Sequence, residues 1–154
     1  MLERTISIDA IEIEAPIDLV WKVLSDFQAY SQWNPFTVAI QTNFVPGDDM
    51  TISIQQGRDK VVHRNFVLET LDPPYLLEWS LPKLGHRLLF SAWRSQRLTS
   101  LSEHTCSYQT SDTFKGLLAP WIYNLQKDWV EKNFNRMARA LKSRCEQLAR
   151  HENR

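Results

Sequence analysis

Hydrophobic and polar residues alternate along most of the first 114 positions of the chain, a pattern typical of β-strands. In Thr5–Glu14, isoleucines alternate with serine, aspartate and glutamate, as expected of a strand with one buried face. Six further strand-like segments are separated by turn residues such as Pro46-Gly47 and Asp72-Pro73-Pro74. They are residues 38–44, 50–55, 61–71, 75–81, 88–98 and 106–114. The sequence therefore predicts seven strands in an antiparallel sheet with one solvated face.

Other segments have the 3.6-residue period of a helix. Apolar residues recur at helical spacing over 17–25, and Asp26 can cap a second short helix that ends before Pro35. From Leu117 to Arg150 the helical period continues for about nine turns, with Pro120 tolerated only in the first. We therefore expect two short helices between the first two strands and one long C-terminal helix.

This order of elements predicts an α+β helix-grip fold. Consecutive antiparallel strands tend to be neighbours in a sheet, and the apolar face of that sheet must be covered. Only the C-terminal helix is large enough, so we expect a curved seven-stranded antiparallel sheet wrapped around it, in a single domain over residues 1–154. Because one helix cannot touch a strongly bent sheet everywhere, a ligand cavity is expected between them.

Composition narrows the classes of function. Lys plus Arg and Asp plus Glu each total 18, so the formal charge is zero and we expect no nucleic-acid partner. No run approaches the roughly 18 apolar residues of a membrane span, and no signal peptide is recognisable. We therefore expect a cytoplasmic protein without integral membrane association. Either a monomer or a homodimer agrees with the sequence.

Six tryptophans, seven phenylalanines and four tyrosines indicate an aromatic interior, which either fills a solid core or lines a cavity. Cys106 and Cys145 are too few for a disulfide framework. His104 and Cys106 are the only close pair of candidate metal ligands, and a metal site needs three or four. The four glycines form no phosphate-binding loop. We expect no metal, no cofactor and no catalytic residue set.

An ordered series of short motifs resembles the START-related helix-grip superfamily (SRPBCC), and is most similar to its bacterial polyketide cyclase/dehydrase-like members. The resemblance covers nearly the whole chain. It rests on Pro16-Ile17-Asp18-Leu19-Val20-Trp21, Phe27, Tyr30, Trp33-Asn34-Pro35-Phe36, Pro46-Gly47, Asp72-Pro73-Pro74, Leu77-Glu78-Trp79, Phe114-Lys115-Gly116-Leu117-Leu118, Phe134-Asn135-Arg136-Met137 and Ala140-Leu141-Lys142.

The resemblance implies a hydrophobic cavity between sheet and helix. Members of the superfamily use this cavity for lipids, polyketides, plant hormones or quinones, and some for cyclisation or dehydration. The chain departs from the common pattern at two places. It has Met137-Ala138 where relatives often have Met-Asn, and Asp112 where many have glutamate.

Strand faces suggest where a site would lie. Arg94 and Gln96 share one face of the sixth strand, while Tyr108 and Asp112 share one face of the seventh. A hairpin between these strands would bring Arg94 close to Asp112. We predict that these four residues form the polar end of the cavity, or else that Arg94 and Asp112 form an ordinary surface salt bridge. The predicted apolar walls are Trp33, Phe36, Trp79, Phe114, Trp121, Leu125 and Trp129.

Two functions remain open. The first is binding or carrying a small hydrophobic ligand, such as a lipid, polyketide, isoprenoid or aromatic compound. The second is a polyketide cyclase, aromatase or dehydratase that uses the same cavity, with Arg94, Asp112, Tyr108 or His104 moving protons. Because no convincing acid/base set is visible, the sequence favours binding over catalysis.

Overall fold

The computed structural model describes residues 2–82 and 88–152. Most of the loop 83–89, whose role at the cavity the sequence leaves open, therefore lies outside the described residues. The elements in chain order are β1 (Glu3–Ser7), β2 (Ile11–Ile13), α1 (Ile17–Ser25), the 3-10 helix η1 (Phe27–Gln32), β3 (Thr37–Thr42), β4 (Asp49–Gln55), β5 (Val61–Asp72), β6 (Leu76–Ser80), β7 (Ser91–Ser100), β8 (Cys106–Lys115) and α2 (Ala119–Glu152).

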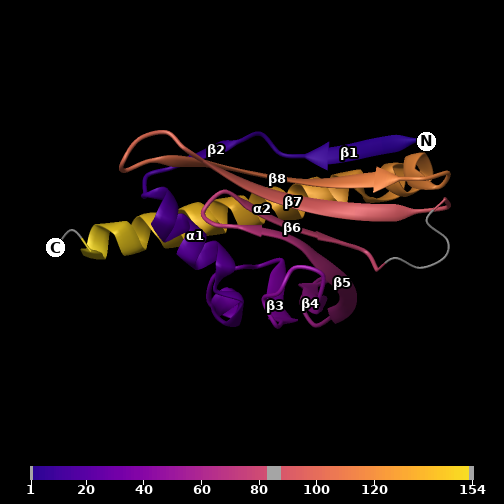
Figure 1. Ribbon diagram of the computed structural model, residues 1–154, viewed down its shortest axis with the longest axis horizontal. Helices are drawn as coiled ribbons and strands as arrows, with labels where there is room; N and C mark the ends of the chain where they lie inside the picture. The colour runs from indigo at the N-terminus through magenta and orange to yellow at the C-terminus, as the bar shows by residue number, and fades with distance from the viewer. Residues whose placement is uncertain (1, 83–87, 153–154) are drawn as a thin grey trace.

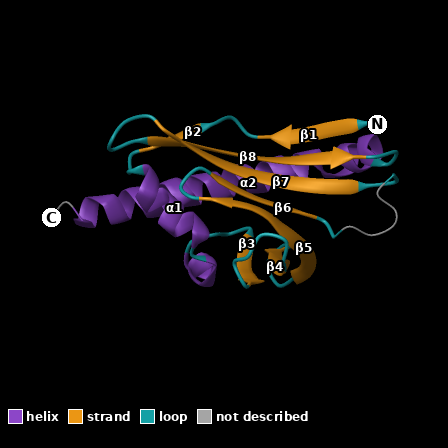
Figure 2. Cartoon of the chain, viewed as in Figure 1, coloured by secondary structure: helices purple, strands orange, loops and turns teal. Residues whose placement is uncertain are grey.

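All the strands belong to one antiparallel sheet with the order β1-β8-β7-β6-β5-β4-β3, and β2 also pairs with β8. The long helix α2 runs along the sheet, with its last turns projecting beyond the strands, and the sheet curls towards β3 and β4 (Figure 1). Figure 2 shows that α1 lies beside the C-terminal half of α2. This arrangement confirms the predicted α+β helix-grip fold.

The expected first strand is divided in two, which raises the number of strands from the expected seven to eight among the described residues. Ile6 pairs with Asp112 in β1, whereas Ile11 pairs with Tyr108 in β2, so the register shifts by one residue across the break. A one-residue insertion of this kind is a bulge, and it reverses which side chains face the core. It explains why Ile6 and Ile13, at positions of opposite parity, are both buried.

The second short helix differs from the expectation in its type and its cap. It is a 3-10 helix, and Asp26 occupies the position before it without a side-chain capping bond. The buried Asn34 sets the direction of the chain after this helix. Its side-chain oxygen accepts hydrogen bonds from the backbone N–H groups of Phe36 and Thr37, each at 2.9 Å. This asparagine turn starts β3 and points the chain so that Phe36 is buried.

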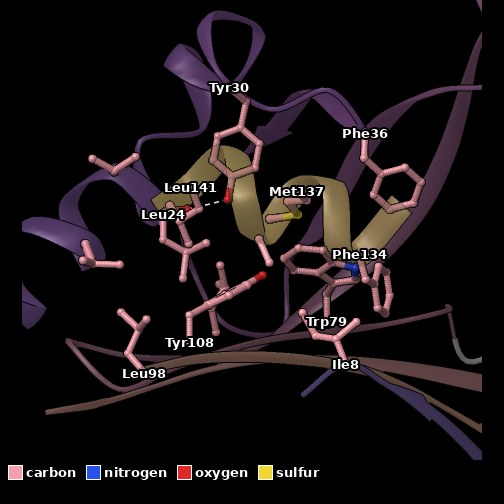
Figure 3. Close-up of a cluster of buried hydrophobic side chains, with 14 of the residues drawn as sticks. Ile8, Leu24, Tyr30, Phe36, Trp79, Leu98, Tyr108, Phe134, Met137 and Leu141 are labelled. Atoms are coloured by element: carbon pink, nitrogen blue, oxygen red, sulfur yellow. Dashed lines mark hydrogen bonds between the residues drawn. The ribbon is translucent and has the colours of Figure 1, made fainter. Parts of the chain in front are cut away.

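The helix α2 has two halves that pack differently. The part from Phe134 onward contributes fully buried side chains, among them Phe134, Met137 and Leu141. In Figure 3 these three lie between Trp79 and Tyr108 of the sheet and Tyr30 of η1. The N-terminal half is far more open, because Trp121 and Leu125 expose 63% and 64% of their surface. The N-terminal half of the helix is thus packed less closely against the sheet than the rest, although the edge strand β1 also contacts the helix.

The end of the sheet near the start of α2 is closed by a tight backbone contact. Gly116 has a φ of +113°, and a Cβ atom at this position would lie 2.6 Å from the carbonyl oxygen of Leu89. Only glycine allows this approach, which places Phe90 beside Phe114, with ring centroids 5.7 Å apart. The two rings form one end of the space beneath the N-terminal half of α2.

Unequal packing along α2 predicts unequal costs for the same substitution. Leu141→Ala should lower the free energy of unfolding by about 2–5 kcal/mol, because it leaves a cavity in the packed half. Leu125→Ala, on the open half, should lower it by less than about 1 kcal/mol. Urea unfolding followed by circular dichroism measures both, and equal losses would contradict this description of the helix.

Candidate functional site: a cavity between the sheet and the long helix

A cavity of about 780 Å³ lies between the sheet and the N-terminal half of α2. It is within the range of about 300–1,000 Å³ that is usual for small-molecule sites. Most of its lining is apolar and comes from β4 to β8, from α2 and from the segments next to them. The exposed rings and side chains of Trp121 and Leu125 form the rim, so the cavity opens to solvent at that side.

Arg94 lies where the cavity meets the packed core. Its side chain leaves β7 on the inner face of the sheet and is only 6% exposed. The guanidinium carbon lies 4.1 Å from the ring centroid of Phe134, 5.4 Å from that of Trp79 and 5.7 Å from that of Phe36. Attraction between a cation and the faces of aromatic rings holds the group in place. Arg94 is therefore an inward-facing cation and not part of a surface salt bridge.

The hydrogen bonds of Arg94 are few and weak. Its Nε donates to the hydroxyl of Thr110 at 3.3 Å, and one terminal nitrogen donates to the sulfur of Met137 at 3.3 Å. Among the described residues, no carboxylate lies within the 4.0 Å of an ion pair with Arg94. The expected ion pair with Asp112 is thus not formed, because the guanidinium reaches past that residue towards α2.

Asp112 nevertheless lies beside Arg94 on the cavity wall, since the two residues are directly paired across β7 and β8. Burial raises the pKa of the Asp112 carboxyl to about 6, and the neighbouring positive charge of Arg94 opposes part of this rise. The carboxyl group consequently changes charge close to physiological pH.

Gln96 and Tyr108 lie deeper than the cavity. Both are fully buried, and the tyrosine hydroxyl donates to the side-chain oxygen of Gln96 at 2.7 Å. Burial raises the pKa of Tyr108, so this hydroxyl stays protonated at neutral pH. The side-chain nitrogen of Gln96 has no hydrogen-bond partner among the described residues. The pair belongs to the core below the floor of the cavity.

The cavity brings together eight of the eleven site residues proposed from the sequence. Those eight are Phe36, Trp79, Arg94, Asp112, Phe114, Trp121, Leu125 and Trp129. Gln96, Tyr108 and Trp33 do not line it. Trp33 instead packs edge-on against Tyr30, with 5.0 Å between the ring centroids. Its side chain supports η1 from outside the cavity.

Sequence analysis missed several lining residues, of which Arg64 is the most important chemically. Arg64 pairs with the buried Ile52 across β4 and β5 and is exposed at the mouth of the cavity. Phe66 lies two residues further along the same face of β5. Val62, Arg64 and Phe66 alternate along β5 and therefore share one face of the strand. Treating Phe66 as an inward-facing residue would have placed Arg64 on the cavity side as well.

The remaining reactive side chains lie elsewhere. Burial raises the pKa of the Cys106 thiol to about 11, so this sulfur is protonated at neutral pH and is a poor nucleophile. His104 is exposed in the turn before β8. Within residues 2–82 and 88–152, no three His, Cys, Asp or Glu side chains gather closely enough to hold a metal ion. In the same ranges, no helix has the length and apolar character needed to cross a bilayer.

The sheet, the long helix and the cavity between them define the class of this protein as a helix-grip domain. The family described as polyketide cyclase/dehydrase and lipid transport matches residues 5–146. The chain therefore belongs to this family, which confirms the resemblance seen in its motifs. Among curated proteins, no sequence matches the chain.

Solved structures with the same fold extend over nearly the full chain. The Zhui aromatase/cyclase from Streptomyces sp. R1128 superposes with a TM-score of 0.74 at 16% identity, covering 95% of each chain. A START superfamily protein from Mycobacterium smegmatis gives 0.70 at 17%, covering 94% of this chain and 98% of its own. Truncated norcoclaurine synthase from Thalictrum flavum gives 0.66 at 12%, covering 92% of each. At these identities the similarity establishes the fold.

The raised pKa of Asp112 predicts a specific pH dependence of stability. The folded protein holds the Asp112 proton more tightly than the unfolded chain, where an aspartate has a pKa of about 3.9. The wild type should therefore lose stability relative to Asp112→Asn as the pH rises from about 4 to about 6, by at most about 3 kcal/mol. Above that window the difference should be constant.

Urea unfolding at a series of pH values measures this difference. Gln28→Ala, an exposed change that involves no titratable group, serves as the control and should keep a constant difference from the wild type. A wild type that gains stability relative to Asp112→Asn over the same window would show that the carboxyl is stabilised in its charged form.

Proposed function

We propose that this protein binds a small, mainly apolar ligand in the cavity between the sheet and the N-terminal half of α2. The observation that carries the proposal is the cavity itself, with its volume of about 780 Å³ and its largely apolar lining, which includes several aromatic rings. A protein interior is normally close-packed, so an open volume of this size needs an occupant or a function. Its wall of Phe36, Trp79, Phe114 and Trp129 suits a flat or extended hydrophobic molecule.

The comparisons support the same proposal. The family is described by polyketide cyclases, dehydrases and lipid transport, all of which handle apolar molecules. One structural neighbour is an aromatase/cyclase, and another is a norcoclaurine synthase in complex with dopamine and hydroxybenzaldehyde. The small, partly aromatic compounds named for that second protein are of a size that this cavity could hold.

Filling the cavity should abolish binding. Ala92 lies on the cavity wall opposite Phe114, and Ala92→Phe would project a ring into the open space. We expect the wild type to enhance the fluorescence of N-phenylnaphthylamine, a neutral apolar probe, and Ala92→Phe to weaken its binding about tenfold or more.

Ala39→Phe is the matched control, because Ala39 lies on β3 opposite Ser53 and does not line the cavity. This variant should bind the probe as the wild type does, and thermal unfolding should show that both variants are folded. The proposal is wrong if the probe fails to bind the wild type, or if both variants bind it equally well.

A second candidate function is a cyclase, aromatase or dehydratase, and one observation favours it. Asp112 lies on the cavity wall with a pKa near 6, a value suited to exchanging protons with a ligand at neutral pH. In that case Asp112 would act as the general acid or base, and Arg94 would stabilise a developing enolate.

Mass spectrometry of compounds recovered from the protein separates the two functions. A carrier releases a poly-β-ketone mimic unchanged, whereas an enzyme releases a cyclised or dehydrated product. For an enzyme, Asp112→Asn should remove at least about 99% of the turnover while the mimic still binds. Unchanged mimic after long incubation with the wild type would leave binding as the function.

A further inference from the structure

We propose that the ligand carries one anionic group, a carboxylate or a similar oxyanion, which pairs with Arg94 at the floor of the cavity. This inference rests on the proposed function, since it requires that the cavity takes a ligand. It adds the chemical class of the ligand, which is an apolar acid and not a neutral hydrocarbon, an alcohol or an amine.

Arg94 is buried at a cost in hydration free energy that its surroundings offset only in part. A guanidinium that is only 6% exposed has lost most of its hydration, and aromatic rings restore only part of that loss. Buried arginines are normally paired with a carboxylate, and among the described residues Arg94 has no such partner within ion-pair distance. Residues 1, 83–87 and 153–154 include no Asp or Glu that could supply one.

The Arg94 guanidinium also has N–H donors that its protein partners do not use. A guanidinium has five N–H donors, and among the described residues its partners within 3.5 Å are the Thr110 hydroxyl and the Met137 sulfur, which is a weak acceptor, while the Tyr108 hydroxyl also interacts with it. Because Arg94 also lines the cavity, its free donors are available to a ligand there. Two parallel N–H groups match the two oxygens of a carboxylate, which makes this pairing both strong and directional.

The charged side chains that line the cavity have a positive balance. Among the described residues, its charged lining residues are Arg64 at the mouth, Arg94 at the floor and Asp112 on the strand next to Arg94, so the positive charges exceed the negative ones. The other titratable groups near Arg94 are Tyr30 and Tyr108, whose pKa values are raised by burial. Both tyrosines are neutral at physiological pH. The site therefore favours an anion over a neutral or cationic molecule.

Asp112 competes with the ligand for Arg94. Asp112 is the cross-strand neighbour of Arg94, and its carboxyl group has a pKa of about 6 because burial disfavours its charge. An incoming oxyanion would disfavour that charge further, and Asp112 would then take up a proton. Affinity for an acid should therefore rise as the pH falls from about 8 to about 6, while affinity for a neutral analogue stays constant.

Pyrenebutanoic acid and pyrenebutanol test the inference, because they share one fluorescent apolar body and differ only at the end group. Energy transfer from the protein's tryptophans reports the binding of either compound. We expect the wild type to bind the acid at least about 30-fold more tightly than the alcohol. The two probes also separate this inference from the proposed function, since the alcohol reports the cavity alone.

Three variants assign the effect to residues. Arg94→Gln should remove the preference for the acid and change the affinity for the alcohol by less than about threefold. Asp112→Asn should strengthen binding of the acid, because it removes the competing carboxylate. Arg97→Gln is the matched control, since Arg97 is exposed on the opposite face of the same strand and should leave both affinities unchanged.

Each outcome has one meaning. Equal affinities of the wild type for acid and alcohol overturn the inference and leave the proposed function standing. A preference for the acid that survives Arg94→Gln also overturns it. Failure of both probes to bind argues against the cavity as a ligand site. Should Arg94→Gln not fold, Arg94→Lys keeps the charge without the paired donors, and must reduce the preference for the inference to hold.

Discussion

The packing of the C-terminal half of α2 against the sheet is the constraint on which the rest of the structure depends. Phe134, Met137 and Leu141 are fully buried there, and they fix both the position and the direction of a helix of 34 residues. Because a helix is rigid over this length, its N-terminal half must continue along the same line. The curved sheet does not follow that line, so the two surfaces separate and the cavity opens between them.

The same packing explains why the polar chemistry lies at one end of the cavity. Phe134 and Met137 are fully buried next to the cavity, and Arg94 contacts both. The arginine thus occupies the boundary between core and cavity, where it is held by the core but faces open space. A core hydrophobe at this position would pack at lower cost. Because Arg94 is charged and faces the cavity at this boundary, the packing of α2 determines where the charged group of a ligand would bind.

Much of the fold could be predicted from the sequence, because the relevant signals are local. Alternation along the strands and the 3.6-residue period of α2 indicated the element order, and the need to cover one sheet face indicated the architecture. The bulge between β1 and β2 is visible in the sequence only as a break in the alternation between Ile8 and Ile11. The residues that line the cavity were harder to predict. Strand alternation indicates the face of the sheet on which a side chain lies, but not whether that side chain reaches the cavity or lies below its floor. Gln96 and Tyr108 share strand faces with Arg94 and Asp112, respectively, yet lie below the floor, and the charge of Arg64 gives no sign that it lines the mouth.

A crystal structure of the protein grown with pyrenebutanoic acid tests the central claim most directly. We expect the pyrene ring to lie between the sheet and the N-terminal half of α2, with the carboxylate within about 3 Å of the Arg94 guanidinium. The claim would be contradicted by a helix that closes onto the sheet and leaves no cavity, or by an acid bound in the cavity with its carboxylate turned away from Arg94.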